Sequence, residues 1–378
     1  MTRHLAANGM TLLIAVLICV LSYLGWAASE YANRAQVTDE VIFEVESGSN
    51  WRRTSEKLER EGVISSSSIF RIGLRYDGLT DELKRGVYAV PGGATMKDIA
   101  ALFSEGGAGG ARYRLTYLIR ADGVEVRLSD QIGSEDFAGM APEALAVRAA
   151  ELVESNESIS LRVAVPEGLT SYQISEGLNA VPLLTGEIAE VPAEGSLAPN
   201  TYEVRDGKAR EELLAEMAAA QRQRVADAWA GRDLTVPVES PEELLILASI
   251  IEKETGVPEE RGRVASVFAN RLERGMRLQT DPTVIYGLTE GKGALGRGLR
   301  RSELDRATPY NTYIIEGLPP TPIANPGELA IKAAAQPDTT DFLFFVADGT
   351  GGHAFAQTLV EHEENVARWR EIEASRDN

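Results

Sequence analysis

The sequence predicts an α+β protein with a single membrane-spanning helix near its N-terminus, and three observations support this fold class. Residues 10–28 are apolar and uncharged, and after them short strand-like and helix-like segments alternate along the chain. The 378 residues leave room for two or three domains. A hydrophobic content of 44% with 25% charged residues is typical of globular protein, which argues against wholesale disorder.

The apolar run at residues 10–28 is long enough to cross a bilayer, since a helix of ~20 residues spans ~30 Å of hydrocarbon. Arg3 precedes the run and acidic residues such as Glu30 and Asp39 follow it. The positive-inside rule therefore places residues 1–9 in the cytoplasm and the bulk of a single-pass inner-membrane protein in the periplasm or outside. The alternative is a cleaved signal peptide with small residues at its end, but the length of the run favours a retained anchor.

A polar linker at residues 29–40 precedes a small α+β module at 41–107. We expect strands at 41–45 and 86–90, because apolar and β-branched residues alternate there. We expect helices ending near residue 60, at 69–76 and at 99–103, the last opened by an approximate capping box of Thr95 and Asp98. The glycines at 106–110 predict a flexible break.

The middle of the chain gives weaker signals. Residues 108–158 alternate only weakly before a predicted helix at 142–154, and residues 159–203 read as a connecting region. That region contains an expected strand at 161–165 and an expected helix at 171–178. A long amphipathic helix at 210–229 then begins the C-terminal domain, residues 204–378.

The helix that follows Ser240 carries the strongest chemical signal. Ser240 is a good N-cap, and the apolar run from 244 to 251 predicts a buried helix. At 100° per residue, Glu254 shares a face with Leu247 and Ile251, whereas Glu252 points elsewhere. A carboxyl beside an apolar face is desolvated, which raises its pKa toward use as a general acid. The alternative is that both glutamates are solvated at the helix end.

Polar and aromatic side chains suited to sugar recognition cluster after a second predicted helix at 260–274. They are Gln279, Thr280, Thr283 and Tyr286, followed in a later loop by Asn311 and Tyr313. Tyr286 could equally belong to the core. Asp281 and Asn325 are predicted helix caps. A hairpin within 342–355 carries His353 as a possible substrate contact, and a closing helix at 358–372 carries His362 as an exposed residue.

Charge and composition exclude several classes of function. Lysine and arginine number 38 against 57 acidic residues, a net charge of −19 that argues against a nucleic acid partner. Cys19 is the only cysteine and the three histidines are scattered, so no zinc pattern exists. We therefore expect neither a metal nor another cofactor.

Several segments in one order resemble the endolytic murein transglycosylase, or YceG-like, family. They read LASIIEKET at 247–255, VASVFANRL at 264–272, GMRLQTDPTVIYG at 275–287, YNTY at 310–313 and FVADGTGGH at 345–353. Residues 41–107 look like that family's LysM-like subdomain, which precedes a mixed α/β catalytic domain. Residues 108–158 do not match and read as an insertion of unknown role.

The resemblance implies a lyase that cuts peptidoglycan strands internally, between MurNAc and GlcNAc, and leaves 1,6-anhydro ends. The family's catalytic glutamate falls on Glu254. We expect substrate contacts from Gln279, Thr280, Asp281, Thr283, Tyr286, Asn311 and Tyr313. The family also implies a role in ending glycan elongation beside penicillin-binding proteins and other cell-wall synthesis and cell-division proteins. Two alternatives stay open: a non-catalytic peptidoglycan-binding scaffold, and a muramidase in which Asp281 or Glu252 assists as a second carboxylate.

Overall fold

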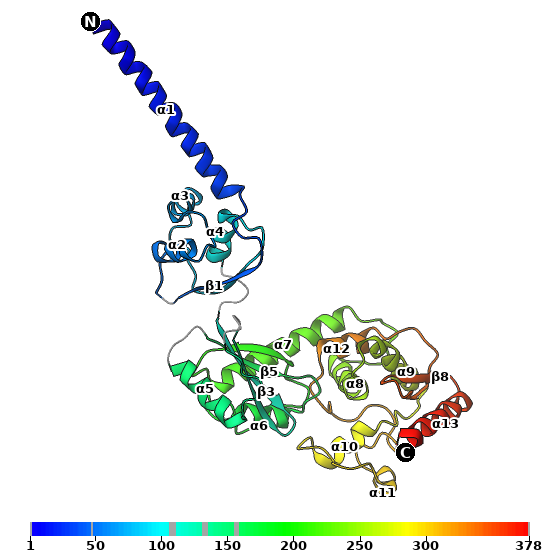
Figure 1. Ribbon diagram of the computed structural model, residues 1–378. Helices are drawn as coiled ribbons and strands as arrows, with labels where there is room; N and C mark the ends of the chain where they lie inside the picture. The colour runs from blue at the N-terminus through cyan, green and yellow to red at the C-terminus, as the bar shows by residue number, and fades with distance from the viewer. Residues whose placement is uncertain (1, 47, 106–110, 131–134, 155–158, 377–378) are drawn as a thin grey trace. The chain divides into compact units, whose positions relative to one another are not determined.

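The computed structural model describes residues 2–46, 48–105, 111–130, 135–154 and 159–376 (Figure 1). The chain forms two compact units, Met1–Leu115 with Val126–Leu161 and Thr116–Glu125 with Arg162–Asn378. Helices and strands are interleaved throughout the described chain, so the predicted α+β fold class is confirmed.

Helix α1 (Thr2–Ala32) runs out of the N-terminal module (Figure 1). Its segment Ile14–Ala32 is long and apolar enough to cross a membrane, a property that a signal sequence shares. The C-terminal end of α1 belongs to the module, because Ala27 and Tyr31 are buried in its core. The Tyr31 hydroxyl also donates a 2.9 Å hydrogen bond to Asp77. The start of the predicted linker is therefore helical and packed.

The N-terminal module matches the predicted order of elements. Strands β1 (Val41–Val45) and β2 (Gly86–Val90) pair antiparallel, and the bounds of the helices are α2 (Trp51–Arg60), α3 (Ser67–Asp77) and α4 (Met96–Glu105). Phe43 stacks on Phe103 with ring centroids 5.5 Å apart inside the core. Thr95 and Asp98 exchange backbone and side-chain hydrogen bonds, which confirms the capping box.

A four-stranded sheet occupies the middle of the chain, with strand order β4-β3-β5-β6. Its strands are β3 (Tyr113–Arg120), β4 (Gly123–Asp130), β5 (Ile159–Val165) and β6 (Asn200–Val204), and helix α5 (Pro142–Glu154) lies between β4 and β5 in sequence. The sequence did not predict β6, because its five residues follow a loop rich in glycine and proline. The predicted break at 106–110 lies outside the described residues.

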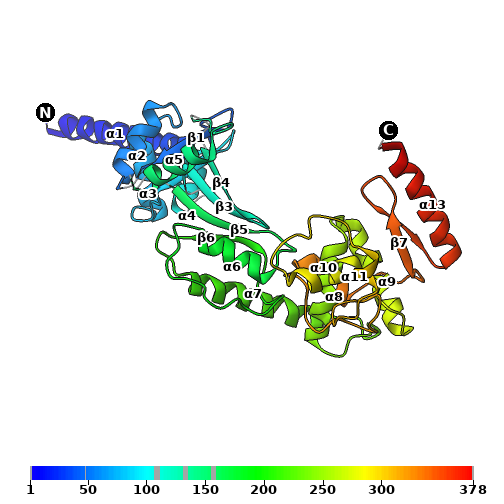
Figure 2. The same ribbon diagram turned by 90° about the horizontal axis from the view of Figure 1, so that it is seen from below.

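The rest of the chain is mostly helical. The remaining elements are α6 (Ser171–Asn179), α7 (Arg210–Ala230), α8 (Pro241–Glu254), η1 (Pro258–Glu260), α9 (Arg261–Glu273), α10 (Asp281–Thr289), α11 (Arg301–Leu304), α12 (Glu328–Ala335), β7 (Phe344–Ala347), β8 (His353–Ala356) and α13 (Leu359–Arg376). Strands β7 and β8 form the predicted antiparallel hairpin, and α13 packs alongside it (Figure 2).

Helix α8 lies at the centre of the C-terminal core. The Ser240 hydroxyl accepts a 3.2 Å hydrogen bond from the Glu243 N–H, which confirms the predicted N-cap. Leu244, Leu247 and Ile251 are fully buried, and α8 contacts α7, α9, α10 and α12. Each such side chain stabilises the fold by about 1.5–3 kcal/mol through burial, so the end of α8 is held firmly in place.

Three predicted local roles are wrong. Thr280, not Asp281, is the N-cap residue of α10, so Asp281 lies in the first turn. Asn325 does not cap α12, because its buried amide instead accepts from the Leu197 N–H at 2.8 Å and donates to the Leu169 carbonyl at 3.1 Å. His362 is half-buried rather than exposed, since its ring stacks on Phe344 at 5.1 Å.

Candidate active site

Glu254 is the last residue of α8 and lies half-buried where that helix ends. The apolar face of α8 passes into the core immediately before it, through the fully buried Ile250 and Ile251. No side chain of the described residues forms an ion pair with the Glu254 carboxyl. The buried helix therefore presents a carboxyl without a neutralising partner.

Glu254 lines a cavity of about 510 Å³. Its lining combines polar side chains from the loop before α10 with apolar side chains from β7 and α13. The lining residues are Glu254, Phe268, Arg271, Leu278, Gln279, Thr280, Asp281, Tyr313, Phe344, Phe345, Val346, Leu359, His362 and Val366. A cavity of this size, with a few convergent polar groups, is the usual form of a small-ligand or substrate site.

The Thr280 hydroxyl donates a short hydrogen bond to the Glu254 carboxylate. Two buried hydroxyls, those of Thr283 and Thr312, fix the Thr280 backbone in place. Its N–H donates to the Thr312 hydroxyl at 3.0 Å, and its carbonyl accepts from the Thr283 hydroxyl at 2.9 Å. The Thr283 and Thr312 hydroxyls also lie 2.9 Å from each other. The Thr280 hydroxyl thus points at the carboxyl. Thr280 occupies the N-cap position of α10, but its side chain makes no capping hydrogen bond to that helix.

Backbone strain accompanies this arrangement at Gln279. Its φ of 50° is in the left-handed region, which costs a residue other than glycine about 1–2 kcal/mol. The Gln279 N–H donates to the Thr312 carbonyl at 3.1 Å, so Thr312 holds the turn from both sides. The turn leaves the Gln279 amide exposed at the wall of the cavity. Such strain collects at functional sites.

Burial raises the pKa of the Glu254 carboxyl, and the hydrogen bond from Thr280 opposes part of that rise. The nearby charge of Asp281 adds to the increase. Asp281 itself accepts a 2.7 Å hydrogen bond from the Tyr313 hydroxyl. A carboxyl whose pKa is raised in this way keeps its proton to higher pH and can deliver it to a leaving group.

Glu252 lies on the other face of α8 and is also buried, with 7% of its side chain exposed. Its carboxylate accepts a 3.0 Å hydrogen bond from the Gly327 N–H and lies 4.0 Å from the Arg261 guanidinium. It does not line the Glu254 cavity. The alternative that both glutamates are solvated is therefore wrong, while the predicted difference in direction is confirmed.

The structure separates the predicted substrate contacts into two groups. Gln279, Thr280, Asp281 and Tyr313 line the cavity with Glu254. Thr283 and Asn311 are fully buried and bonded internally, Asn311 to the carbonyls of Glu303, Leu304 and Arg306. Tyr286 packs on Tyr310 and donates to Glu194 at 3.2 Å, outside the cavity. Thr283, Asn311 and Tyr286 therefore do not line the cavity.

Sequence reasoning missed several residues of the site. Arg271 and His362 both line the cavity, and Thr312 anchors Thr280. The helical pattern around Arg271 suggested only an amphipathic helix, and nothing local linked Thr312 to Glu254. His353 pairs with Glu260, its ring Nδ1 lying 2.8 Å from the carboxylate, and does not line the cavity.

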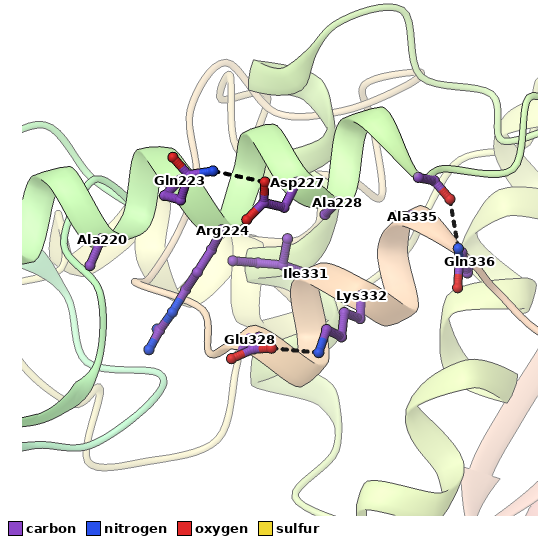
Figure 3. A pocket seen from close by; sticks show the side chains of 11 residues that line it. Ala220, Gln223, Arg224, Asp227, Ala228, Glu328, Ile331, Lys332, Ala335 and Gln336 are labelled. Carbon is purple, nitrogen blue, oxygen red and sulfur yellow. Dashed lines mark hydrogen bonds and ion pairs between the residues drawn. The ribbon is translucent and has the colours of Figure 1, made fainter.

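A second cavity of about 480 Å³ lies between α7 and α12 (Figure 3). Its polar side chains have partners within the protein. Gln223 donates to Asp227 at 2.8 Å, and Lys332 pairs with Glu328. Gln336 donates to the Gly231 carbonyl at 2.6 Å, and Arg224 to the Pro199 carbonyl at 3.1 Å. The hydrogen bond from Lys332 lowers the pKa of the Glu328 carboxyl in this lining, which keeps it ionised. The Glu254 cavity is therefore the better candidate for chemistry.

Comparisons with known proteins agree with the sequence motifs. The model of the YceG-like family matches residues 43–368 of this chain. A curated protein named endolytic murein transglycosylase from Bacillus subtilis is 28% identical over 325 residues, which are 85% of this chain and 82% of that protein. A protein of the same name from Streptococcus pneumoniae is 30% identical over 331 residues, which are 85% of this chain but 56% of that longer protein.

A 2.6 Å crystal structure of a yceG-like protein from Listeria monocytogenes is also similar. The two chains share 27% sequence identity with a TM-score of 0.46, and the match covers 86% of this chain and 99% of that one.

Proposed function

The chain belongs to the YceG-like family, and from that membership and the geometry around Glu254 we propose that it is a lytic transglycosylase of peptidoglycan. The observation that carries the proposal is a single half-buried carboxyl whose pKa is raised by burial at the wall of a substrate-sized cavity. The relatives from Bacillus subtilis and Streptococcus pneumoniae, both named endolytic murein transglycosylase, support the choice of substrate.

The proposed reaction cuts the bond between MurNAc and GlcNAc inside a glycan strand. Protonated Glu254 gives its proton to the glycosidic oxygen as the bond to C1 of MurNAc breaks. The resulting Glu254 carboxylate then takes the proton of the MurNAc C6 hydroxyl, whose oxygen attacks C1. The products are a 1,6-anhydro-MurNAc end and a new GlcNAc end, and Glu254 has regained its proton. The substrate supplies the nucleophile, so one carboxyl can serve as acid and then as base.

The surroundings of Glu254 suit both stages. Burial favours the protonated form that the first stage needs. The Thr280 hydroxyl favours the carboxylate formed between the stages, because a hydrogen bond to a charged acceptor is about twice as strong as one between neutral groups. Gln279 and Tyr313 are our candidates for sugar contacts, since both line the cavity and offer polar groups.

The alternatives make different products. A muramidase would use Asp281 with Glu254, and water would add to the cleaved end; Asp281 is the only other carboxyl among the described residues that line the cavity. A scaffold would bind peptidoglycan and leave it uncut. Glu252 is a weaker second carboxylate, because its contacts with Gly327 and Arg261 turn it away from the cavity.

The proposal includes a location and partners. Helix α1 would anchor the chain in the inner membrane with residues 1–9 in the cytoplasm, which the hydropathy of Ile14–Ala32 supports. The module at 41–107 would act as a LysM-like subdomain, and residues 204–378 as the catalytic domain that trims nascent strands beside penicillin-binding proteins and other cell-wall synthesis proteins. Residues 108–158 would be an insertion, and 159–203 a connecting region.

Product analysis tests the proposed function. Purified full-length protein is incubated with sacculi, and the soluble fragments are analysed by mass spectrometry. We expect fragments with 1,6-anhydro-MurNAc ends and no gain of water. Fragments with reducing ends would favour the muramidase, and binding without fragments would favour the scaffold.

A further inference from the structure

The Glu254 cavity contains a buried cation that pairs with no carboxylate of the described residues. Arg271, on α9, is 7% exposed and lines the cavity. Its Nε donates to the Leu343 carbonyl at 2.6 Å, and its Nη1 donates to the Arg277 and Leu278 carbonyls at 3.2 and 2.9 Å. Its carbon Cζ lies 5.1 Å from the centre of the Phe344 ring. The backbone thus fixes the guanidinium firmly without neutralising its charge.

One edge of this guanidinium is left for a ligand. Nη2 donates no hydrogen bond among the described residues, whereas Nε and Nη1 donate to backbone carbonyls and Nη1 also to the Gln279 side chain at 3.4 Å. A second polar group of the same cavity also has no partner in the described chain: the buried Nδ1 of His362. The two groups approach the Phe344 ring from α9 and α13. A buried polar atom without a partner, such as His362 Nδ1, is rare unless a ligand or water completes it.

We propose that Arg271, assisted by His362, forms a subsite for a carboxylate of the substrate. The inference rests on the proposed peptidoglycan substrate. Two sources carry this chemistry: the lactyl carboxylate of a MurNAc without its peptide, and the carboxylates of the peptide stem. A fixed guanidinium is well suited to such a group, because its planar N–H donors match carboxylate oxygens.

The subsite answers an electrostatic problem. The chain carries a net charge of −19, which repels a substrate that carries carboxylates. A cation inside the cavity offsets this repulsion where the substrate binds. Glu254 and Asp281 line the same cavity and add to this repulsion. A carboxylate bound to Arg271 would also offset the field of that cation at Glu254, which would help the catalytic acid keep its proton.

Equilibrium binding tests the proposal without requiring cleavage. Full-length Glu254→Gln protein is titrated with short glycan strands whose carboxyl groups are either native or converted to amides. We expect the amides to raise Kd about tenfold or more, the usual effect of losing a charged hydrogen bond. The experiment is done with peptide-bearing strands and with strands stripped of their peptides. If amidation weakens binding only for the peptide-bearing strands, the bound group is a carboxylate of the peptide stem. If amidation also weakens binding of the stripped strands, the bound group is the lactyl carboxylate.

Protein variants sharpen the test. In Glu254→Gln/Arg271→Gln, the difference between native and amidated strands should shrink to less than about twofold, while Arg274→Gln, an exposed position at the end of α9, should keep it. If the double variant does not fold, the titrations with Glu254→Gln still show whether a carboxylate of the strand contributes to binding. Equal Kd values for native and amidated strands in both sets would overturn the subsite. Anhydro ends made by the wild-type protein would then still support the proposed function, and their absence alone would not affect the binding result.

Discussion

The two faces at the end of α8 place one residue type in two different environments. Glu252 and Glu254 are two positions apart and both are desolvated, so burial raises the pKa of both carboxyls. Glu252 is enclosed by the Gly327 N–H and the Arg261 guanidinium, whereas Glu254 opens on a cavity and receives one hydroxyl. Desolvation alone therefore does not identify a catalytic acid. Glu254 differs from Glu252 in its access to a cavity and in having no ion pair among the described residues.

The comparison predicts the largest effect at Glu254. We expect Glu254→Gln to lower the rate of strand cleavage by about 10²–10⁴-fold, the range for loss of a general acid. The fold should remain, because glutamine can still accept the hydrogen bond from Thr280. The rate of fragment release from sacculi measures the effect, with circular dichroism as the control for folding. Cleavage within a few-fold of wild type would show that Glu254 is not the acid.

Substitution of Glu252, on the opposite face of α8, should lower stability without lowering the cleavage rate. Glu252→Ala removes the acceptor of the Gly327 N–H. It also removes one of the two ion-pair partners that buried Arg261 has among the described residues, leaving the more exposed Glu167 at 3.7 Å. We expect the free energy of unfolding to fall by about 2 kcal/mol, while the folded fraction keeps its cleavage rate. Denaturant titration measures the loss, and Glu242→Ala, exposed on the same helix, is the matched control. A loss of activity as large as that of Glu254→Gln would make Glu252 part of the machinery.

A smaller effect is expected at Thr280, whose hydroxyl lowers the pKa of Glu254 and takes no direct part in the proposed proton transfers. Thr280→Val removes the hydrogen bond to the carboxylate, so the pKa of Glu254 should rise further. We expect about a tenfold lower rate and a shift to higher pH of the limb on which activity falls as Glu254 loses its proton. Thr280→Ser should restore both. An unchanged pH profile in Thr280→Val would contradict this role.

The smallest effect concerns stability and follows from the sign of the same shift. The pKa of Glu254 is higher in the folded than in the unfolded chain, so wild-type stability falls as pH rises above the ordinary carboxyl value of ~4.3. Glutamine does not titrate. Glu254→Gln should therefore be more stable at neutral pH by about 1 kcal/mol, or roughly 2–4 °C in Tm. Thermal melts should show this advantage disappear near pH 4, and an equal difference at both pH values would contradict it.

Local patterns in the sequence predicted most of the helices and strands and the position of Glu254 beside the apolar face of α8. The N-terminal module, α8 and the β7–β8 hairpin follow from alternation, capping residues and the apolar run before Glu254. Contacts between distant segments could not be read in this way. The link from Thr312 to Thr280, the burial of Asn325 and the seat of His362 on Phe344 each join residues far apart in sequence. The sequence therefore showed no sign of the hydrogen bond from Thr280 to Glu254, and it wrongly placed His362 on the surface.

In the proposed reaction one carboxyl suffices, because the C6 hydroxyl of the substrate, not water, attacks C1. Cleavage of sacculi in water enriched in heavy oxygen tests this claim directly, by mass spectrometry of the newly formed ends. We expect the wild-type protein to form anhydro ends that contain no heavy oxygen, and the Glu254→Gln protein to form no anhydro ends. One heavy oxygen atom in each new end would contradict it and would establish hydrolysis instead.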